Sequence, residues 1–135
     1  MTTVSGQLLQ QVVERGGIGD GRGIAAAFAL GASAVQLGTT YLHCPESLLP
    51  ADAREVLSTR PTVMTNVYTG GLARAVRGRL VDEIGPVRNE APPYPLAGTL
   101  AMPLFRAAIA HGDFNFMPSL AGQSAWLGRA LPAAE

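Results

Sequence analysis

The pattern of apolar and polar positions is clearest between residues 20 and 37. Four apolar side chains recur there at helical spacing: Ile24, Ala25, Phe28 and Ala29. Alanine is the best helix former, so we predict a helix over residues 20–30 that ends at Gly31. The short apolar run 32–37 is typical of a buried parallel strand. A helix followed closely by such a strand is half of a repeating unit, so the sequence predicts the α/β class.

Residues 1–15 are compatible with two structures. Their apolar positions are Leu8, Leu9, Val12 and Val13. The polar residues around them favour an amphipathic helix. However, Gly16-Gly17 comes directly afterwards, and a Gly-Gly corner before a helix normally follows a strand. A helix and a short strand therefore both remain open for this stretch.

Beyond Pro50 the pattern predicts four helices and one strand. We expect the helices over residues 51–58, around Leu72, Val76, Leu80 and Ile84, over residues 96–110 with a break or fresh start near Pro103, and over residues 122–131. The strand is expected over residues 61–68, where Thr and Val are frequent. Ala53, Val56 and Leu57 should face inward on the first of these helices, and Trp126 should lie in or over the core.

Composition and charge narrow the range of functions. The chain of 135 residues is 47% hydrophobic and 15% charged, which suits a globular protein. Ten acidic and ten basic residues cancel, so there is no general electrostatic case for binding nucleic acid or an anionic membrane. No apolar stretch reaches the roughly 18 residues that a membrane helix needs, and the N-terminus has no signal-peptide pattern. We therefore expect a cytoplasmic protein that binds neither nucleic acid nor membrane.

Cysteine and histidine give no sign of a disulfide or a metal site. Cys44 is the single cysteine, so an intrachain disulfide is excluded. His43 and His111 are far apart in the sequence, and no Cys-X-X-Cys motif occurs. We therefore predict no metal centre.

The candidate chemistry lies in two glycine-containing corners, residues 16–24 and residues 36–39. Glycine lets the backbone approach a ligand closely, and Asp20 is placed to cap the following helix. Amide N–H groups at such a corner favour phosphate, although glycine turns before helices often serve packing only. The pairing of the two corners favours an anion site, because the loops after strands seven and eight of a (β/α)₈ barrel bind phosphate. The candidate residues are Gly16, Gly17, Gln36, Leu37, Gly38 and Thr39.

The same residues resemble a known family. Residues 16–27 read GGIGDGRGIAAA and residues 35–39 read VQLGT, which is similar to the nitronate monooxygenase family, formerly called 2-nitropropane dioxygenase. Three downstream pieces agree in order: Tyr68-Thr69-Gly70, Tyr94-Pro95-Leu96 and Ala121-Gly122-Gln123-Ser124-Ala125. The resemblance runs from about residue 16 to residue 135.

The resemblance implies a fold and a cofactor. The family fold is an FMN-binding TIM (β/α)₈ barrel, of which this chain would be the C-terminal portion with a helical insertion or tail. Gly17, in the turn with Gly16, would give a backbone N–H to the FMN phosphate. Gln36, Leu37, Gly38 and Thr39 would form the other wall of the site, with the amides of Gly38 and Thr39 on the phosphate. Gln123 would approach the flavin.

The resemblance also implies a domain organisation. A complete barrel needs about 250 residues, so the chain would supply only the end of one. We treat residues 1–135 as one domain, a partial barrel. In it, residues 16–44 form the phosphate-binding βα units, and residues 45–135 form a C-terminal helical region with one strand. The open barrel edge predicts self-association.

The implied reaction is the FMN-dependent oxidation of an alkyl nitronate, a small-molecule substrate. The family's catalytic histidine belongs to a segment absent from this chain, and neither His43 nor His111 lies in a matching motif, so no catalytic residue is assigned. Two alternatives remain open. One is another flavin or nucleotide barrel oxidoreductase, such as an enoyl reductase or an inosinate dehydrogenase-like enzyme. The other is a non-catalytic, truncated module that binds flavin or phosphate.

Overall fold

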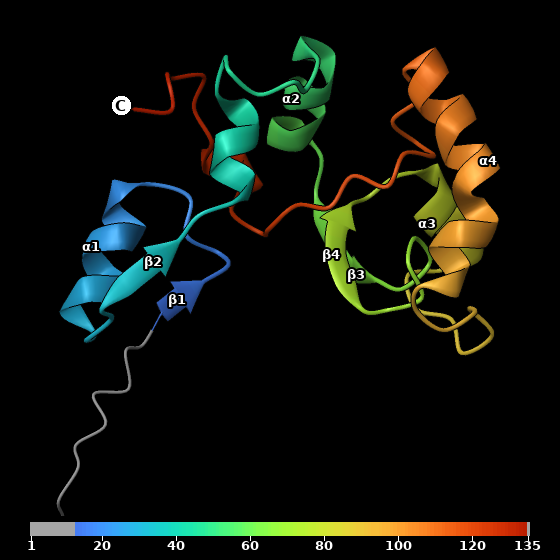
Figure 1. Cartoon of the computed structure of the whole chain (residues 1–135), viewed down its shortest axis with the longest axis horizontal. Coiled ribbons are helices and arrows are strands. Elements are labelled where there is room, and N and C mark those ends of the chain that lie inside the picture. The colour runs from blue at the N-terminus through green and yellow to red at the C-terminus, as the bar shows by residue number, and fades with distance from the viewer. Residues whose placement is uncertain (1–12, 135) are drawn as a thin grey trace, which may run out of the picture.

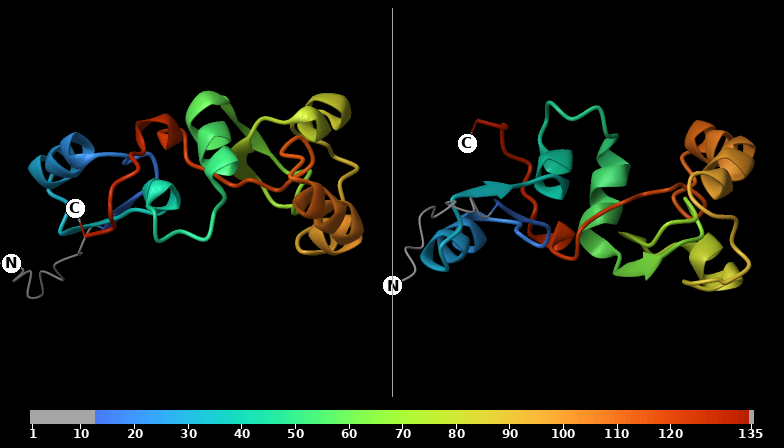
Figure 2. Two further views of the ribbon diagram at one scale, coloured as in Figure 1. Left: turned by 90° about the horizontal axis from the view of Figure 1, so that it is seen from above. Right: turned by 60° about the horizontal axis from the view of Figure 1, so that its bottom comes forward.

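The computed structural model describes residues 13–134, with side chains described from residue 16. The elements follow in the order β1 (Val13–Arg15), α1 (Gly21–Ala29), β2 (Ala34–Gln36), η1 (Thr39–His43), α2 (Ala51–Thr59), β3 (Thr62–Thr65), β4 (Ala73–Val76), α3 (Arg79–Ile84), α4 (Leu96–His111) and η2 (Ala125–Leu127). They form two groups, β1, α1 and β2 at one end and β3, β4, α3 and α4 at the other, with α2 between them (Figures 1 and 2). We call residues 13–44 the N-terminal unit and residues 61–118 the C-terminal region.

The N-terminal unit is a parallel βαβ arrangement. β1 pairs with β2 in register, with Val13 opposite Ala34 and Arg15 opposite Gln36. For residues 13–15 the strand alternative is therefore correct and the helix is wrong, whereas residues 1–12 lie outside the described residues. Asp20 caps α1, and Gly31 follows the helix with a φ of 97°. Both ends of the predicted helix are thus confirmed.

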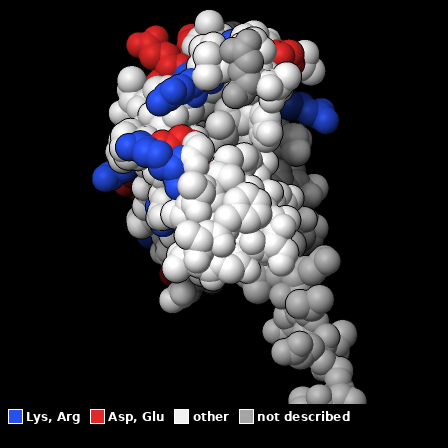
Figure 3. Space-filling model, turned by 90° about the vertical axis from the view of Figure 1, so that its left-hand side faces the viewer, with Lys and Arg blue, Asp and Glu red and all other residues white. Residues whose placement is uncertain are grey.

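The apolar positions of the N-terminal unit are more exposed than the sequence pattern predicts. The run 32–37 was expected to be buried, yet the β2 residues are exposed or only half-buried. Phe28 is 49% exposed and Leu30 is 90% exposed. Among the described residues the two-stranded sheet has no third strand, so nothing there covers these side chains. The end of the molecule that carries α1 accordingly presents a broad uncharged surface (Figure 3).

The C-terminal region contains a strand where a helix was predicted. β3 and β4 pair antiparallel, with Thr62 opposite Val76 and Thr65 opposite Ala73. The helix expected around residues 72–84 is therefore wrong for its first half and is confined to α3, which begins after Gly78. Pairing with β3 overrides the helical spacing of the apolar residues, as tertiary contacts commonly do. The expected region with one strand consequently has two.

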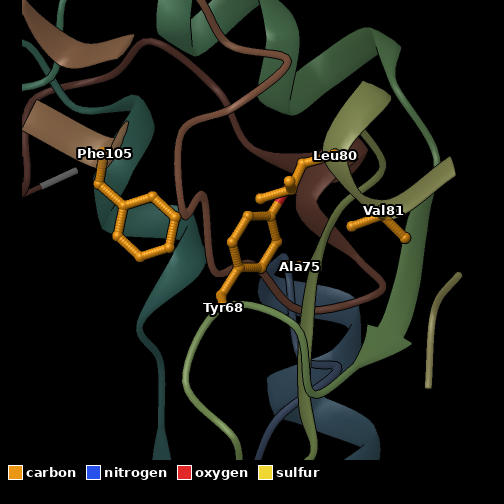
Figure 4. Packing of buried hydrophobic residues seen from close by; sticks show 5 residues of the cluster. All are labelled: Tyr68, Ala75, Leu80, Val81 and Phe105. Carbon is orange, nitrogen blue, oxygen red and sulfur yellow. The ribbon is translucent and has the colours of Figure 1, made fainter. Parts of the chain in front are cut away.

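The core of the C-terminal region lies between the hairpin and α4. Its buried residues are Tyr68, Ala75, Leu80, Val81 and Phe105 (Figure 4). The rings of Tyr68 and Phe105 are 6.0 Å apart, within the range of favourable aromatic pairs. Burial, with a smaller contribution from Asp82, raises the pKa of Tyr68. The break expected near Pro103 is wrong, because α4 continues through this exposed position and loses only the hydrogen bond that the proline nitrogen cannot donate.

After α4 the chain returns across the molecule towards the N-terminal unit (Figure 1). We call residues 119–128 the return segment. Val76 N–H donates to the Ser119 carbonyl, and Ala121 N–H donates to the Arg74 carbonyl, so the segment lies along β4. The predicted helix 122–131 is reduced to the single turn η2, and Trp126 is 67% exposed instead of lying in the core. Gly122 and Gly128 flank this turn, and glycine disfavours helix propagation.

α2 joins the two groups of elements. Ala53 and Leu57 are buried as predicted. Leu57 belongs to a second cluster with Val76, Ala121 and Ala125, which brings α2, β4 and the return segment together. Within residues 13–134, no helix combines the length and apolar character that a membrane span requires.

Candidate anion-binding site

The two glycine-containing corners meet at one pocket of about 430 Å³. The residues that line it are Gly16, Gly17, Ile18, Gln36, Leu37, Gly38, Thr39, Gly122 and Ser124. All six residues selected from the sequence are among them. The carboxyl ends of two neighbouring parallel strands meet at the same edge of a sheet, which explains the proximity of the two corners.

The first wall of the pocket is the turn after β1. Gly16 and Gly17 have φ values of 85° and 76°, a conformation that favours glycine.

The amides of Gly17 and Gly38, one from each corner, donate to no acceptor within the part of the chain that the structure describes. A Cβ added at Gly38 would meet nothing within 4 Å, so this side of the pocket is open. Free backbone N–H groups beside open space are suited to an anion.

The N-terminus of α1 is not available to an anion. The Asp20 carboxylate accepts the amides of Arg22 and Gly23, at 3.0 and 3.1 Å from Oδ1. The Arg22 side-chain hydrogen bond, followed by the Gly23 amide, lowers the pKa of Asp20. The sequence suggested that these helical N–H groups would favour a phosphate, but the cap occupies them. The candidate donors are therefore those of the two corners.

The second wall begins where β2 ends. Thr39 Oγ1 accepts the amide of Gly122 at 2.9 Å, and the neighbouring Thr40 hydroxyl donates to the Gly19 carbonyl at 3.3 Å. These two threonines thus hold the second corner against the return segment on one side and against the glycine turn on the other.

The return segment supplies a third wall that the site prediction did not include. Gly122 and Ser124 line the pocket, and the Gln123 Nε2 atom lies 3.5 Å from the position that a Cβ on Gly17 would occupy. Gln123 was expected near the flavin by resemblance, and its side chain does lie beside the glycine turn. The sequence signal for this wall was the Ala121–Ala125 piece of the motif, but nothing in it indicated a hydrogen bond to Thr39.

Neither histidine lines this pocket. His43 is buried, its Nε2 atom has no hydrogen-bond partner among the described residues, and its ring packs against Gly128. His111 lies at the exposed end of α4. No group of three or more metal-ligating side chains occurs within residues 13–134. A larger pocket of about 530 Å³ is lined by Asp20, Tyr41 and Arg129 among others.

The parallel βαβ unit, with a pocket at the carboxyl ends of its strands, matches the C-terminal portion of a (β/α)₈ barrel that carries a helical tail. The chain belongs to the nitronate monooxygenase family, whose model matches residues 11–135. It is 44% identical over 128 residues to a nitronate monooxygenase of Pseudomonas aeruginosa, covering 92% of this chain and 36% of that protein. It is 34% identical to a probable nitronate monooxygenase of Staphylococcus aureus, covering 90% of this chain and 35% of that protein.

Solved structures agree with this assignment. A nitroalkane oxidase from Streptomyces ansochromogenes superimposes with a TM-score of 0.82 at 40% identity, over 91% of this chain and 36% of that one. FabK from Thermotoga maritima superimposes with a TM-score of 0.69 at 35% identity, over 90% of this chain and 39% of that one. The chain therefore spans a little over a third of the length of the relatives that it matches, and the expected partial barrel is confirmed.

Proposed function

We propose that this chain takes part in the FMN-dependent oxidation of alkyl nitronates by holding the FMN phosphate. The observation that supports this proposal is that Gly17 and Gly38, whose amides donate to no acceptor among the described residues, line one open pocket in a member of the nitronate monooxygenase family. When bound, FMN supplies the redox chemistry, taking electrons from the nitronate and passing them to O₂.

The residues of the pocket are compatible with a phosphate group. Gly16, Gly17 and Gly38 have no side chains to obstruct it, and the amides of Gly17, Gly38 and Thr39 would donate to its oxygens. No arginine lines the pocket, so the negative charge would be stabilised by neutral donors. The flavin ring would gain little burial from this chain alone. Its affinity for FMN should therefore be far below that of a complete barrel, because burial contributes about 25 cal/mol per Å².

The proposal assigns binding to this chain and leaves proton transfer to residues outside it. His43 is buried against Gly128, and His111 is at the end of α4, so neither reaches the pocket. On its own the chain would then be a non-catalytic flavin- or phosphate-binding module.

A titration of FMN, followed by an oxygen-uptake assay with a small alkyl nitronate, tests both statements. We expect weak FMN binding that falls by at least about tenfold in Gly38→Asp, which places a carboxylate beside the phosphate and costs about 1.4 kcal/mol or more. Gly21→Asp is the matched control, because it adds the same charge on α1, where a Cβ meets nothing within 4 Å. Turnover that depends on Gly38 would show that the chain is catalytically sufficient. Absence of FMN binding would refute the binding role.

We also propose that the isolated chain self-associates through the N-terminal unit. β1 and β2 each have one strand neighbour among the described residues, and α1 exposes Phe28. Unpaired strand edges and exposed apolar surface favour association. Sizing chromatography should show oligomers, and a sharp monomer peak with a cooperative thermal transition would contradict this.

A further inference from the structure

We propose that Thr39 is a positioning residue, whose side-chain hydroxyl fixes the return segment as the third wall of the anion pocket. The proposal deepens the phosphate-binding function proposed above. Its expected effect on ligand affinity rests on that function. It assigns to the hydroxyl a role separate from that of the Thr39 backbone amide.

Two consecutive amides of the return segment hold opposite parts of the molecule. Ala121 N–H donates to the Arg74 carbonyl in β4 at 3.1 Å, and Gly122 N–H donates to Thr39 Oγ1 at 2.9 Å. Within residues 13–134, the second is the one hydrogen bond that joins the N-terminal unit to the return segment. The Thr39 hydroxyl therefore connects the anion pocket to the sheet of the C-terminal region.

The backbone of the return segment lies close to both corners of the pocket at the position of this hydrogen bond. A Cβ on Gly122 would lie 3.5 Å from Thr39 Oγ1 and 3.8 Å from the Gly17 nitrogen. A Cβ on Gly19 would lie 2.9 Å from the Leu127 Cβ atom, so the glycine turn also fits directly against η2. The return segment thus touches both corners of the pocket, and one side-chain oxygen fixes its distance from the second corner.

The hydrogen bond determines which groups face the pocket. It brings Gly122 and Ser124 to the pocket wall and keeps the side-chain amide of Gln123 beside Gly17. Because Oγ1 accepts from Gly122, the hydroxyl proton of Thr39 remains free to donate. Loss of the hydroxyl would release the third wall and weaken anion binding, even with all the corner amides in place.

Three threonine variants separate this role from a direct contact with the ligand. Thr39→Val keeps the shape of the side chain and removes the acceptor, Thr39→Ser keeps the acceptor, and Thr99→Val is a control at an exposed position of α4. In the absence of FMN we expect Thr39→Val to speed amide exchange at Gly122 by about two- to tenfold, the loss of one hydrogen bond. Trp126, the single tryptophan, should become more accessible to a fluorescence quencher. The FMN dissociation constant should rise by a similar factor. In Thr39→Ser, the exchange rate of Gly122, the quenching of Trp126 and the FMN dissociation constant should all stay close to those of the unmodified chain.

The outcomes distinguish the positioning role from the proposed function. If the unmodified chain binds no FMN but Thr39→Val still releases Gly122 and Trp126, the proposed function fails and the positioning role stands. If Thr39→Val weakens FMN binding without changing Gly122 exchange or Trp126 quenching, the hydroxyl acts directly on the ligand and the positioning role is overturned. If Thr39→Val does not fold, backbone amide exchange in the unmodified chain tests the positioning role. Gly122 must then exchange more slowly than Gln123, whose backbone amide has no acceptor among the described residues, and equal rates would overturn the role.

Discussion

The N-terminal unit and the C-terminal region are built from similar short elements but bury them very differently. In the C-terminal region, β3, β4, α3 and α4 enclose a cluster in which Phe105 is 3% exposed. In the N-terminal unit, Ala27 is the single buried residue of α1. An antiparallel hairpin pairs with itself and here packs against α3 and α4, whereas parallel strands depend on neighbours and on covering helices on both faces. The C-terminal region therefore encloses a core of its own, although α4 leaves Leu100 64% and Ile109 57% exposed, whereas the N-terminal unit buries little.

Glycine is also used differently in the two regions. A Cβ added at Gly70 would lie 2.2 Å from the Pro92 carbonyl oxygen, and one at Gly78 would lie 2.7 Å from the Asn115 carbonyl oxygen. At Gly16 and Gly38 an added Cβ would meet nothing within 4 Å. Glycine therefore permits close packing at Gly70 and Gly78, as it also does at Gly19 in the N-terminal unit, whereas Gly16 and Gly38 shape the backbone around an open pocket.

The largest expected effect is on core stability. Phe105→Ala should lower the free energy of unfolding by about 3–5 kcal/mol, because it empties the core against Tyr68. Phe28→Ala removes a side chain that is already 49% exposed, and it should cost less than about 1.5 kcal/mol. Chemical denaturation of both variants measures the difference. Equal losses of stability would contradict the difference in burial between the two regions, since they would mean that Phe28 is buried in solution, for example in an oligomer.

Gly16 and Gly70 allow a matched test of the two regions. Gly16 and Gly70 have φ values of 85° and 86°, so an alanine meets the same backbone strain at either site. That strain costs about 1–2 kcal/mol. Gly70→Ala should cost about 1–3 kcal/mol more than Gly16→Ala, because only at Gly70 does the new methyl group overlap backbone atoms. Denaturation midpoints at equal protein concentration test this, and a larger loss in Gly16→Ala would contradict the open pocket.

Local signals in the sequence were sufficient to bring the two glycine-containing corners to one pocket and insufficient for the pairing of distant segments. Asp20, Gly31 and the two corners are read from a few neighbouring residues, and the structure places them as predicted, with the exception of the N–H groups that Asp20 occupies. β4 was missed because the helical repeat of Leu72, Val76, Leu80 and Ile84 runs through it, and its strand partner lies in β3. The third wall was missed because Thr39 and Gly122 are separated by 83 residues, and no local pattern encodes their hydrogen bond.

The smallest expected effect concerns pH and the way in which α1 is held. α1 buries little, so its capping interaction should contribute more to its order than packing does. The pKa of Asp20 is lowered, chiefly by the Arg22 hydrogen bond. The stabilising contribution of the carboxylate is therefore fully present above the ordinary value of 3.8 and is lost as the pH falls through the lower, folded-state pKa. Backbone chemical shifts of α1 should change with a midpoint below that value, and those of α4, which has no such cap, should not follow. Asp20→Asn keeps a capping acceptor that does not titrate, so it should abolish the transition without unwinding the helix. A midpoint at or above 3.8 would show that neither the Arg22 side chain nor the amides of Arg22 and Gly23 hold this carboxylate, and those amides would then be free to bind an anion after all.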